Sequence, residues 1–152
     1  MIHSFKYKPF IKDLAEPLAF LIITHFHLLN KTFAHKEFIL VPIPLYKSKM
    51  KQRGFNQAEE IGKILSRSLK IPLITDALIK TRQSSTQANL SKEQREENVK
   101  GVFLVKNKQK IKDKKVLLVD DIYTTGATME EAAKVLKKAK AKEVLGVVIA
   151  RG

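Results

Sequence analysis

Two adjacent aspartates, followed by a loop rich in hydroxyl groups, are the residues of this sequence best suited to chemistry. Asp120 and Asp121 come directly after the apolar run 116–119, and the loop 122–128 follows them. Carboxylates accept hydrogen bonds from hydroxyl groups, and backbone N–H groups at a helix N-terminus bind phosphate. The pattern predicts a site for a ligand with a diol and a phosphate, such as ribose 5-phosphate. The loop residues expected to bind the phosphate are Thr124, Thr125, Gly126, Ala127 and Thr128.

Two other phosphate-binding patterns do not fit this loop. A Walker loop requires a Gly-Lys-Ser/Thr ending, and that lysine is absent. A dinucleotide fingerprint requires three glycines, whereas only Gly126 is present. The remaining alternative is an ordinary strand–loop–helix turn with acids near the start of the helix. The combination of two acids, three threonines and a glycine after a buried strand favours the ligand site over that alternative.

The elements that must position the loop alternate as in a parallel α/β fold. Apolar runs predict buried strands at 38–44, 116–119 and 144–150, and shorter ones at 71–73, 77–79 and 102–105. Apolar positions at helical spacing predict helices at 56–69 and after residue 128. Thr128 and Glu131 have the spacing of a capping box at the start of the second helix. Because ligands bind beyond the carboxyl ends of parallel strands, Asp120 and Asp121 are well placed.

Other segments give weaker signals. Residues 1–35 include apolar residues at helical spacing, which Pro17 is expected to interrupt. The polar stretch 81–99 predicts a functional or disordered loop. Residues 106–115 contain six lysines and predict a solvated turn; as a DNA-binding surface this turn lacks aromatic partners for bases. The apolar residues at helical spacing are Phe10, Leu14, Leu18, Leu21 and Ile22.

Composition limits the class of protein. A chain of 152 residues with 44% hydrophobic residues predicts one folded domain. The absence of cysteine excludes disulfides, thiolate metal sites and a cysteine nucleophile. A net charge of +14 favours polyanionic partners, or else reflects lysines on solvated faces. The apolar run 18–23 is too short to span a bilayer, so we expect a cytoplasmic protein with no membrane contact.

The segment from Val116 to Met129 resembles the ribose-phosphate signature of type I phosphoribosyltransferases. Further motifs are similar to the ComF-like branch, named for bacterial competence protein F, and the resemblance runs from about Phe5 to the end of the chain. One departure is that many ComF-like proteins carry an N-terminal cysteine-rich zinc segment, which this cysteine-free sequence lacks. The motifs are Val41-Pro-Ile-Pro-Leu45, Arg53-Gly-Phe-Asn-Gln57, and Arg82, Gln87, Leu90, Arg95, Asn98 and Gly101-Val-Phe103.

The resemblance implies a parallel-sheet type I phosphoribosyltransferase fold, with a small hood-like helical segment at 1–35 and a core at 36–152. It implies binding of 5-phosphoribosyl 1-pyrophosphate with Mg²⁺, the metal being held mainly through the substrate rather than by a protein cage. Transfer of the ribosyl phosphate to a nucleobase-type acceptor would release pyrophosphate. The resemblance also implies a role related to competence and DNA uptake.

The resemblance assigns roles to individual residues. Asp120 and Asp121, as catalytic residues, hold the ribose 2- and 3-hydroxyls, and residues 124–128 hold the 5-phosphate. Residues 81–98 form a mobile loop that closes over the reaction. Residues expected to face the pyrophosphate are Pro42, Ile43 and Pro44, with Lys47, Arg53 and Arg82 as its cations.

Several alternatives remain open at the level of sequence. The domain could bind its ligand without turnover, or act as an accessory protein that contacts single-stranded DNA, a helicase or other DNA-uptake proteins. Asn56 could cap the helix at 56–69 or support the active-site turn. The pair His25 and His27 lies in a helix-like stretch, so we interpret it, like His3 and His35, as a set of surface or core histidines rather than metal ligands.

Overall fold

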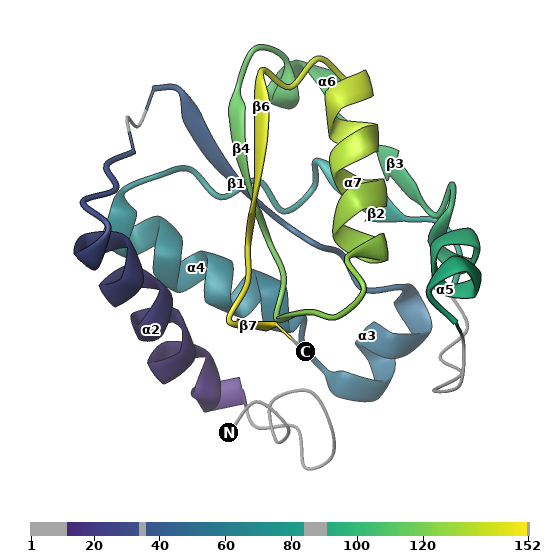
Figure 1. The fold of residues 1–152 in the computed structure, drawn as a ribbon, viewed down its shortest axis with the longest axis horizontal. Helices are drawn as coiled ribbons and strands as arrows, with labels where there is room; N and C mark the ends of the chain where they lie inside the picture. The colour runs from purple at the N-terminus through teal and green to yellow at the C-terminus, as the bar shows by residue number, and fades with distance from the viewer. Residues whose placement is uncertain (1–11, 34–35, 84–90, 152) are drawn as a thin grey trace.

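The centre of the molecule is a sheet of three parallel strands in the order β1-β4-β6 (Figure 1). The computed structural model describes residues 12–33, 36–83 and 91–151. The strands are β1 (Phe38–Pro42), β4 (Lys115–Val119) and β6 (Glu143–Val147). Pro42 lies beside Val119, and Val119 beside Val147, so the carboxyl ends of all three strands meet at one edge of the sheet. The parallel α/β prediction is confirmed.

Helices cover both faces of this sheet (Figure 1). On one face lie α2 (Ala15–Leu28) and α4 (Gln57–Leu69), and on the other lies α7 (Ala127–Lys138). The side chains of β4 alternate between the two cores, because successive residues of a strand point to opposite faces. Val116 and Leu118 join the core under α7, whereas Leu117 and Val119 join the core under α2 and α4. All four are buried, as expected of a central parallel strand.

The N-terminal helix corrects one expectation. A short 3-10 turn, η1 (Lys12–Leu14), leads into α2, and Pro17 is the third residue of that helix. A proline in the first turn removes an N–H that has no partner within the helix, so α2 continues without interruption. Leu18 is buried as predicted, but Leu21 is 56% exposed and lies on the outer face.

The remaining elements are short helices and strands outside the three-stranded sheet. The strand predicted at 71–73 is reduced to an isolated bridge between Leu73 and Leu40. The elements are α3 (Lys47–Arg53), β2 (Leu78–Lys80), antiparallel to β3 (Phe103–Val105), α5 (Lys92–Val99), α6 (Lys108–Ile111), and β5 (Ile122–Tyr123), parallel to β7 (Ala150–Arg151).

Two polar segments contain helices that their composition did not predict. Helix α5 occupies the end of the stretch predicted to be a loop, and a capping box between Ser91 and Gln94 starts it. The prediction of a structureless segment is therefore wrong for 92–99, while 84–90 lie outside the described residues. In the lysine-rich stretch, α6 turns Ile111 into the core, where it is fully buried.

The last strand is shorter and more exposed than predicted. Instead of one buried strand over 144–150, the chain forms β6 and the two-residue β7. Among the described residues β6 pairs with β4 alone, and its Leu145 is 40% exposed. An apolar run predicts burial but cannot distinguish a central strand from the edge of a sheet. No helix in the described part of the chain is both long and apolar enough to cross a membrane.

Candidate ligand site at the carboxyl ends of the strands

The two aspartates are fixed by backbone hydrogen bonds at the end of β4. The N–H of Asp120 donates to the carbonyl of Val147 (3.0 Å), and the carbonyl of Asp121 accepts from the N–H of Ile149 (3.2 Å). Asp120 Oδ1 accepts from the N–H of Asp121 (2.8 Å), and Asp121 Oδ1 accepts from the N–H of Ile122 (2.8 Å). The carboxylates are therefore oriented before any ligand binds.

The turn after the aspartates requires glycine at position 126. Gly126 has a φ of +85°, in the left-handed region that side chains disfavour. A Cβ atom there would collide with the hydroxyl of Tyr123 and lie 2.9 Å from Glu130 Oε1. Helix α7 begins at the next residue, so the N–H groups of its first turn face the loop. This geometry is suited to an anion.

The loop residues differ in their exposure. Gly126 and Ala127 are buried, Thr125 and Thr128 are half-buried, and Thr124 is exposed. The predicted capping box is wrong, because α7 begins at Ala127 and Thr128 is its second residue. Glu131 instead accepts a hydrogen bond from the N–H of Gly101 (2.8 Å), which joins α7 to the end of α5.

Tyr123 covers one side of this turn. Its hydroxyl lies against Gly126 and 3.4 Å from Glu130 Oε1. The guanidinium carbon of Arg151 lies 5.6 Å from the centroid of the Tyr123 ring. Tyr123 thus packs against the glycine turn that precedes α7.

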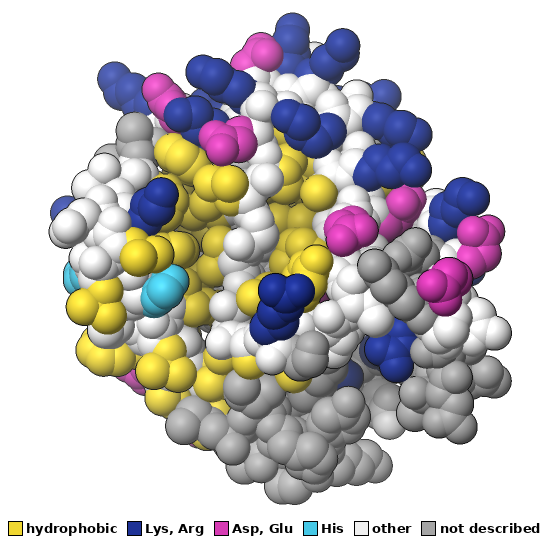
Figure 2. All heavy atoms as spheres, viewed as in Figure 1, with side chains coloured by type: hydrophobic (Ala, Val, Ile, Leu, Met, Phe, Trp, Pro, Cys, Tyr) yellow, Lys and Arg dark blue, Asp and Glu magenta, His cyan; other side chains and the backbone are white. Residues whose placement is uncertain are grey.

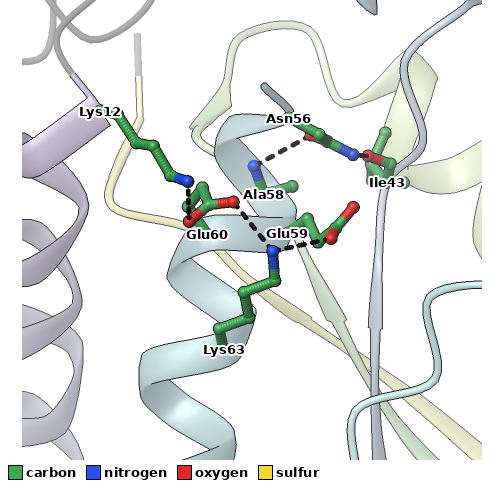
Figure 3. A network of polar contacts seen from close by, with 7 residues as sticks. All are labelled: Lys12, Ile43, Asn56, Ala58, Glu59, Glu60 and Lys63. Carbon is green, nitrogen blue, oxygen red and sulfur yellow. Dashed lines mark hydrogen bonds and ion pairs between the residues drawn. The ribbon is translucent and has the colours of Figure 1, made fainter. Parts of the chain in front are cut away.

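The turn after β1 lies beside the acids and is held by Asn56 (Figure 3). The N–H of Ile43 donates to the carbonyl of Val119 (2.8 Å), the last residue of β4. Asn56 Nδ2 donates to the carbonyl of Ile43 (3.0 Å), while its Oδ1 accepts from the N–H of Ala58 (3.1 Å). Asn56 therefore caps α4 and also holds the turn after β1, so the capping interpretation is confirmed, while the role of this turn in an active site stays a prediction.

An ion cluster on the first two turns of α4 is structural (Figure 3). Lys63 Nζ lies 3.0 Å from Glu59 and 2.9 Å from Glu60. The hydrogen bonds that Lys63 donates to these carboxylates raise its pKa, the one to Glu60 most. Lys12 pairs with Glu60 at 3.4 Å and links η1 to α4. The cluster stabilises the helix that carries Asn56.

The predicted cations come from separate elements. Lys47 begins α3 and is exposed, and Pro42 and Ile43 at the turn are buried with Pro44 half-buried. Arg53 ends α3, and its Nη1 donates to Oε1 of the buried Gln57 (2.9 Å). Arg82 is exposed, and its Nη2 donates to the carbonyl of Lys100 (2.8 Å).

Lys80 is a cation that sequence reasoning missed. It is the last residue of β2, one position beyond the predicted strand 77–79. The pKa of Lys80 is lowered to about 8, first by burial and then by the positive charges of Lys49 and Arg82, while the carboxylate of Asp120 opposes this shift. Lys80 therefore lies within electrostatic reach of Arg82 and Asp120. The available signal was a lysine that ends an apolar strand.

Residues that could contact a Mg²⁺ ion include Asp120 and Asp121 at the end of β4. The described residues contain no group of three or more His, Cys, Asp or Glu that could hold an ion. His25 and His27 lie exposed on α2, and His3 and His35 are outside the described residues. Adjacent carboxylates beside the turn that precedes α7 fit Mg²⁺, which binds through one or two carboxylates, waters and substrate phosphates.

A second charged region lies at the opposite end of the sheet, where α6 precedes β4 and α7 ends (Figure 1). Figure 2 shows lysine and arginine side chains gathered at the top of the view, over this end. A hollow of about 390 Å³ lies between the two helices. We call it the lysine hollow; its lining residues are Lys108, Gln109, Lys112, Lys138, Ala139 and Lys140.

Comparison with known proteins places this geometry in context. Residues 56–152 match the family model described as the phosphoribosyl transferase domain. The chain is 37% identical over 106 residues to competence protein F of Haemophilus influenzae, covering 69% of this chain and 46% of that protein. It is 36% identical over 124 residues to competence protein ComFC of Bacillus subtilis, covering 80% of this chain and 48% of that protein. The chain thus spans about half the length of these relatives.

A third relative and a solved structure extend the comparison. DNA utilization protein YhgH of Escherichia coli is 34% identical over 97 residues, which cover 64% of this chain and 42% of that protein. The structure of glutamine phosphoribosylpyrophosphate amidotransferase from B. subtilis, complexed with ADP and GMP, aligns with a TM-score of 0.62. The two sequences are 16% identical, and the alignment covers 97% of this chain and 30% of that one. This similarity therefore shows the fold alone.

Proposed function

The chain belongs to the phosphoribosyl transferase domain family as a ComF-like member, and we propose that it binds 5-phosphoribosyl 1-pyrophosphate with Mg²⁺ at the carboxyl ends of β1 and β4. Its fold is the α/β fold of type I phosphoribosyltransferases, and its relatives include competence proteins. The substrate, the metal and the reaction are proposals that rest on the geometry of the site.

One observation carries the proposal: a fixed acid pair is followed within five residues by a left-handed glycine and a helix N-terminus. A carboxylate has about four acceptor positions, so a bond to a neighbouring N–H leaves capacity for a hydroxyl group. Asp120 and Asp121 are proposed to accept the ribose 2- and 3-hydroxyls. The N–H groups of residues 124–128 and the hydroxyls of the threonines would bind the 5-phosphate.

The pyrophosphate end of the ligand is assigned to the turn at residues 42–45. This turn neighbours Asp120 because β1 and β4 are paired in parallel and the N–H of Ile43 donates a hydrogen bond to the carbonyl of Val119. Lys47, Arg53 and Arg82 are proposed as its cations. Mg²⁺ would offset the charge of the pyrophosphate, with Asp120 and Asp121 as its nearest protein carboxylates.

The reaction that fits such a ligand is transfer of the ribosyl phosphate to a nucleobase-type acceptor. The bond from C1 to the pyrophosphate oxygen breaks, a bond from C1 to an acceptor nitrogen forms, and that nitrogen loses its proton. Incubation with the activated sugar and a panel of bases would detect turnover as pyrophosphate release. Release that needs one particular base supports transfer, whereas binding without release for every base leaves a ligand-binding protein.

The binding proposal is tested by titration calorimetry with the activated sugar and Mg²⁺. The double variant Asp120→Asn with Asp121→Asn keeps the size of both side chains but removes their charge. We expect its Kd to rise at least about a hundredfold, since each hydroxyl–carboxylate bond contributes about 1.5–3 kcal/mol. Asp113→Asn is the matched control, because Asp113 is exposed, precedes β4 at the other end of the sheet, and has a φ of +61° that asparagine tolerates. An unchanged Kd in the double variant would refute the site.

A second candidate function, contact with single-stranded nucleic acid, is favoured by the lysine hollow. Four of its six lining residues are exposed lysines, and none is acidic. Lysines also suit the negative end of α7, whose last residue is Lys138, so the helix dipole offers a simpler reason for part of this charge. Backbone phosphates would bind there without sequence preference.

Salt dependence separates the two explanations. We expect replacement of the four lysines of the hollow by glutamine to lower the slope of log Kd against log salt for a labelled oligonucleotide by about 2–3. The matched control removes four exposed positive charges from the α2/α4 side: Lys12, Lys31, Arg67 and Lys70. Equal changes in both quadruple variants would mean that net charge alone attracts the oligonucleotide.

A further inference from the structure

Lys80 occupies an unusual position for a lysine at the proposed site. It ends β2, pairs with Phe103 across the antiparallel ladder, and its Nζ lies 5.7 Å from the centroid of the Phe103 ring. The side chain is half-buried, and Phe103 is 5% exposed. An ammonium group packed over an aromatic face has lost part of its water, which costs free energy unless an anion replaces that water.

The charged groups near Lys80 belong to three different segments of the chain. Lys49 belongs to α3, Arg82 follows β2, and Asp120 follows β4, while the neighbour across the ladder on β3 is the uncharged Phe103. Lys80 thus lies within electrostatic reach of two further cations and one carboxylate. A ligand with several negative charges would stabilise the ammonium form of Lys80 against both its burial and the two neighbouring cations.

This inference rests on the proposed function. We propose that Lys80 is a binding residue for the pyrophosphate end of the ligand, and that it takes up one proton from solvent as the ligand binds. The amine becomes an ammonium group and no bond of the ligand changes. Arg82 cannot act in this way, because a guanidinium group remains protonated at all ordinary pH values.

The titration of Lys80 makes the proposal measurable. With burial lowering its pKa to about 8, Lys80 is about half neutral at pH 8 in the free protein. A polyanion stabilises the ammonium form, so the pKa of Lys80 rises in the complex. Binding at pH 8 should then take up about half a proton, and affinity should fall about tenfold between pH 7 and pH 9.

The experiment is calorimetry of the activated sugar with Mg²⁺ at pH 8 in two buffers of different ionisation enthalpy. The observed enthalpies give the number of protons taken up. Lys80→Arg keeps a cation but cannot lose its proton, so we expect binding with uptake reduced by about half a proton and a flatter pH profile. Lys31→Arg, an exposed lysine after α2, is the matched control and should behave like wild type. Protons released or bound by the ligand itself cancel in this comparison.

The outcomes distinguish this inference from the proposed function. If wild type and Lys80→Arg bind the ligand with equal proton uptake and parallel pH profiles, the role of Lys80 is overturned while the site stands. If wild type does not bind the ligand at all, both proposals fail. A smaller uptake in Lys80→Arg alone supports the role of Lys80.

Discussion

The two ends of the central sheet carry charge in different ways. At the carboxyl end, Asp121 is 5% exposed, Lys80 is half-buried, and the turns beside them are held by hydrogen bonds of 2.8–3.2 Å. At the amino end, the lysines of the hollow are exposed to water. Charges removed from water cost free energy, whereas solvated lysines cost almost none. The burial of charged groups therefore marks the proposed ligand site better than their number does.

The largest expected effect is that of a substitution in the turn at the carboxyl end of the sheet. Gly126→Ala combines a disfavoured φ with a collision against the Tyr123 hydroxyl, so we expect it to lower the free energy of unfolding by about 2–5 kcal/mol. Gly54→Ala is the matched control, because Gly54 has a similar φ of +80° but open space around its Cβ position. Urea unfolding of both variants separates collision from backbone strain. Equal losses would show that Tyr123 moves aside.

The support of the neighbouring turn gives the next largest effect. Asn56→Ala removes the cap of α4 and leaves the carbonyl of Ile43 without this donor, so we expect a loss of about 2–3 kcal/mol in the free energy of unfolding. Asn107→Ala provides the comparison, because Asn107 precedes α6 without capping it through its side chain. Thermal unfolding of the two variants should differ by several degrees. Similar melting temperatures would show that the Asn56 bonds contribute little.

The parts of the site that are local in sequence could be predicted, and the parts that depend on tertiary contacts could not. The strand at 116–119, the aspartates and Gly126 form one continuous stretch whose pattern carries both fold and chemistry. Lys80 is forty residues away from Asp120 and reaches its neighbourhood through a three-residue strand. Such a short strand gives almost no periodic signal.

The errors have separate physical causes. Helix α5 has no apolar stripe, and the signal that identifies its start is the pair Ser91 and Gln94. The capping box expected at Thr128 failed because a glycine turn starts α7 at Ala127, two residues earlier than a helix capped by Thr128 would begin. The exposure of β6 follows from its place at the edge of the sheet, which depends on strand order rather than on the apolar content of the strand.

The cost of a buried charge gives the third prediction. Lys80→Met should raise the free energy of unfolding at pH 7 by about 1–3 kcal/mol, because methionine also packs against Phe103 and brings no charge. Lys112→Met, at an exposed lysine of the hollow, should change it by less than about 0.5 kcal/mol. A stabilised Lys80→Met variant that binds its ligand poorly would be the expected trade-off for a functional cation.

The pH dependence of this gain has a definite sign. The pKa of Lys80 is about 8 in the folded chain and near 10.5 in the unfolded chain, so between these values the unfolded state binds more protons. Wild type therefore gains stability as pH rises through this window, and the advantage of Lys80→Met should shrink from pH 7 to pH 10. A constant advantage over that range would show that packing, not charge, explains the gain.

The smallest effect belongs to a surface ion pair near the amino end. Lys110 Nζ lies 2.9 Å from Asp76 Oδ2, and its hydrogen bond lowers the pKa of Asp76 below the ordinary 3.8. The contribution of this pair to stability is present above that ordinary value and is lost as pH falls through the lower pKa of the folded state. Lys110→Gln should return the pKa of Asp76 toward its ordinary value, as measured by NMR titration, and leave the melting temperature at pH 7 unchanged. A clear drop in melting temperature would mean that charge contacts also stabilise the amino end. The two ends would then differ less than the burial of their charges indicates.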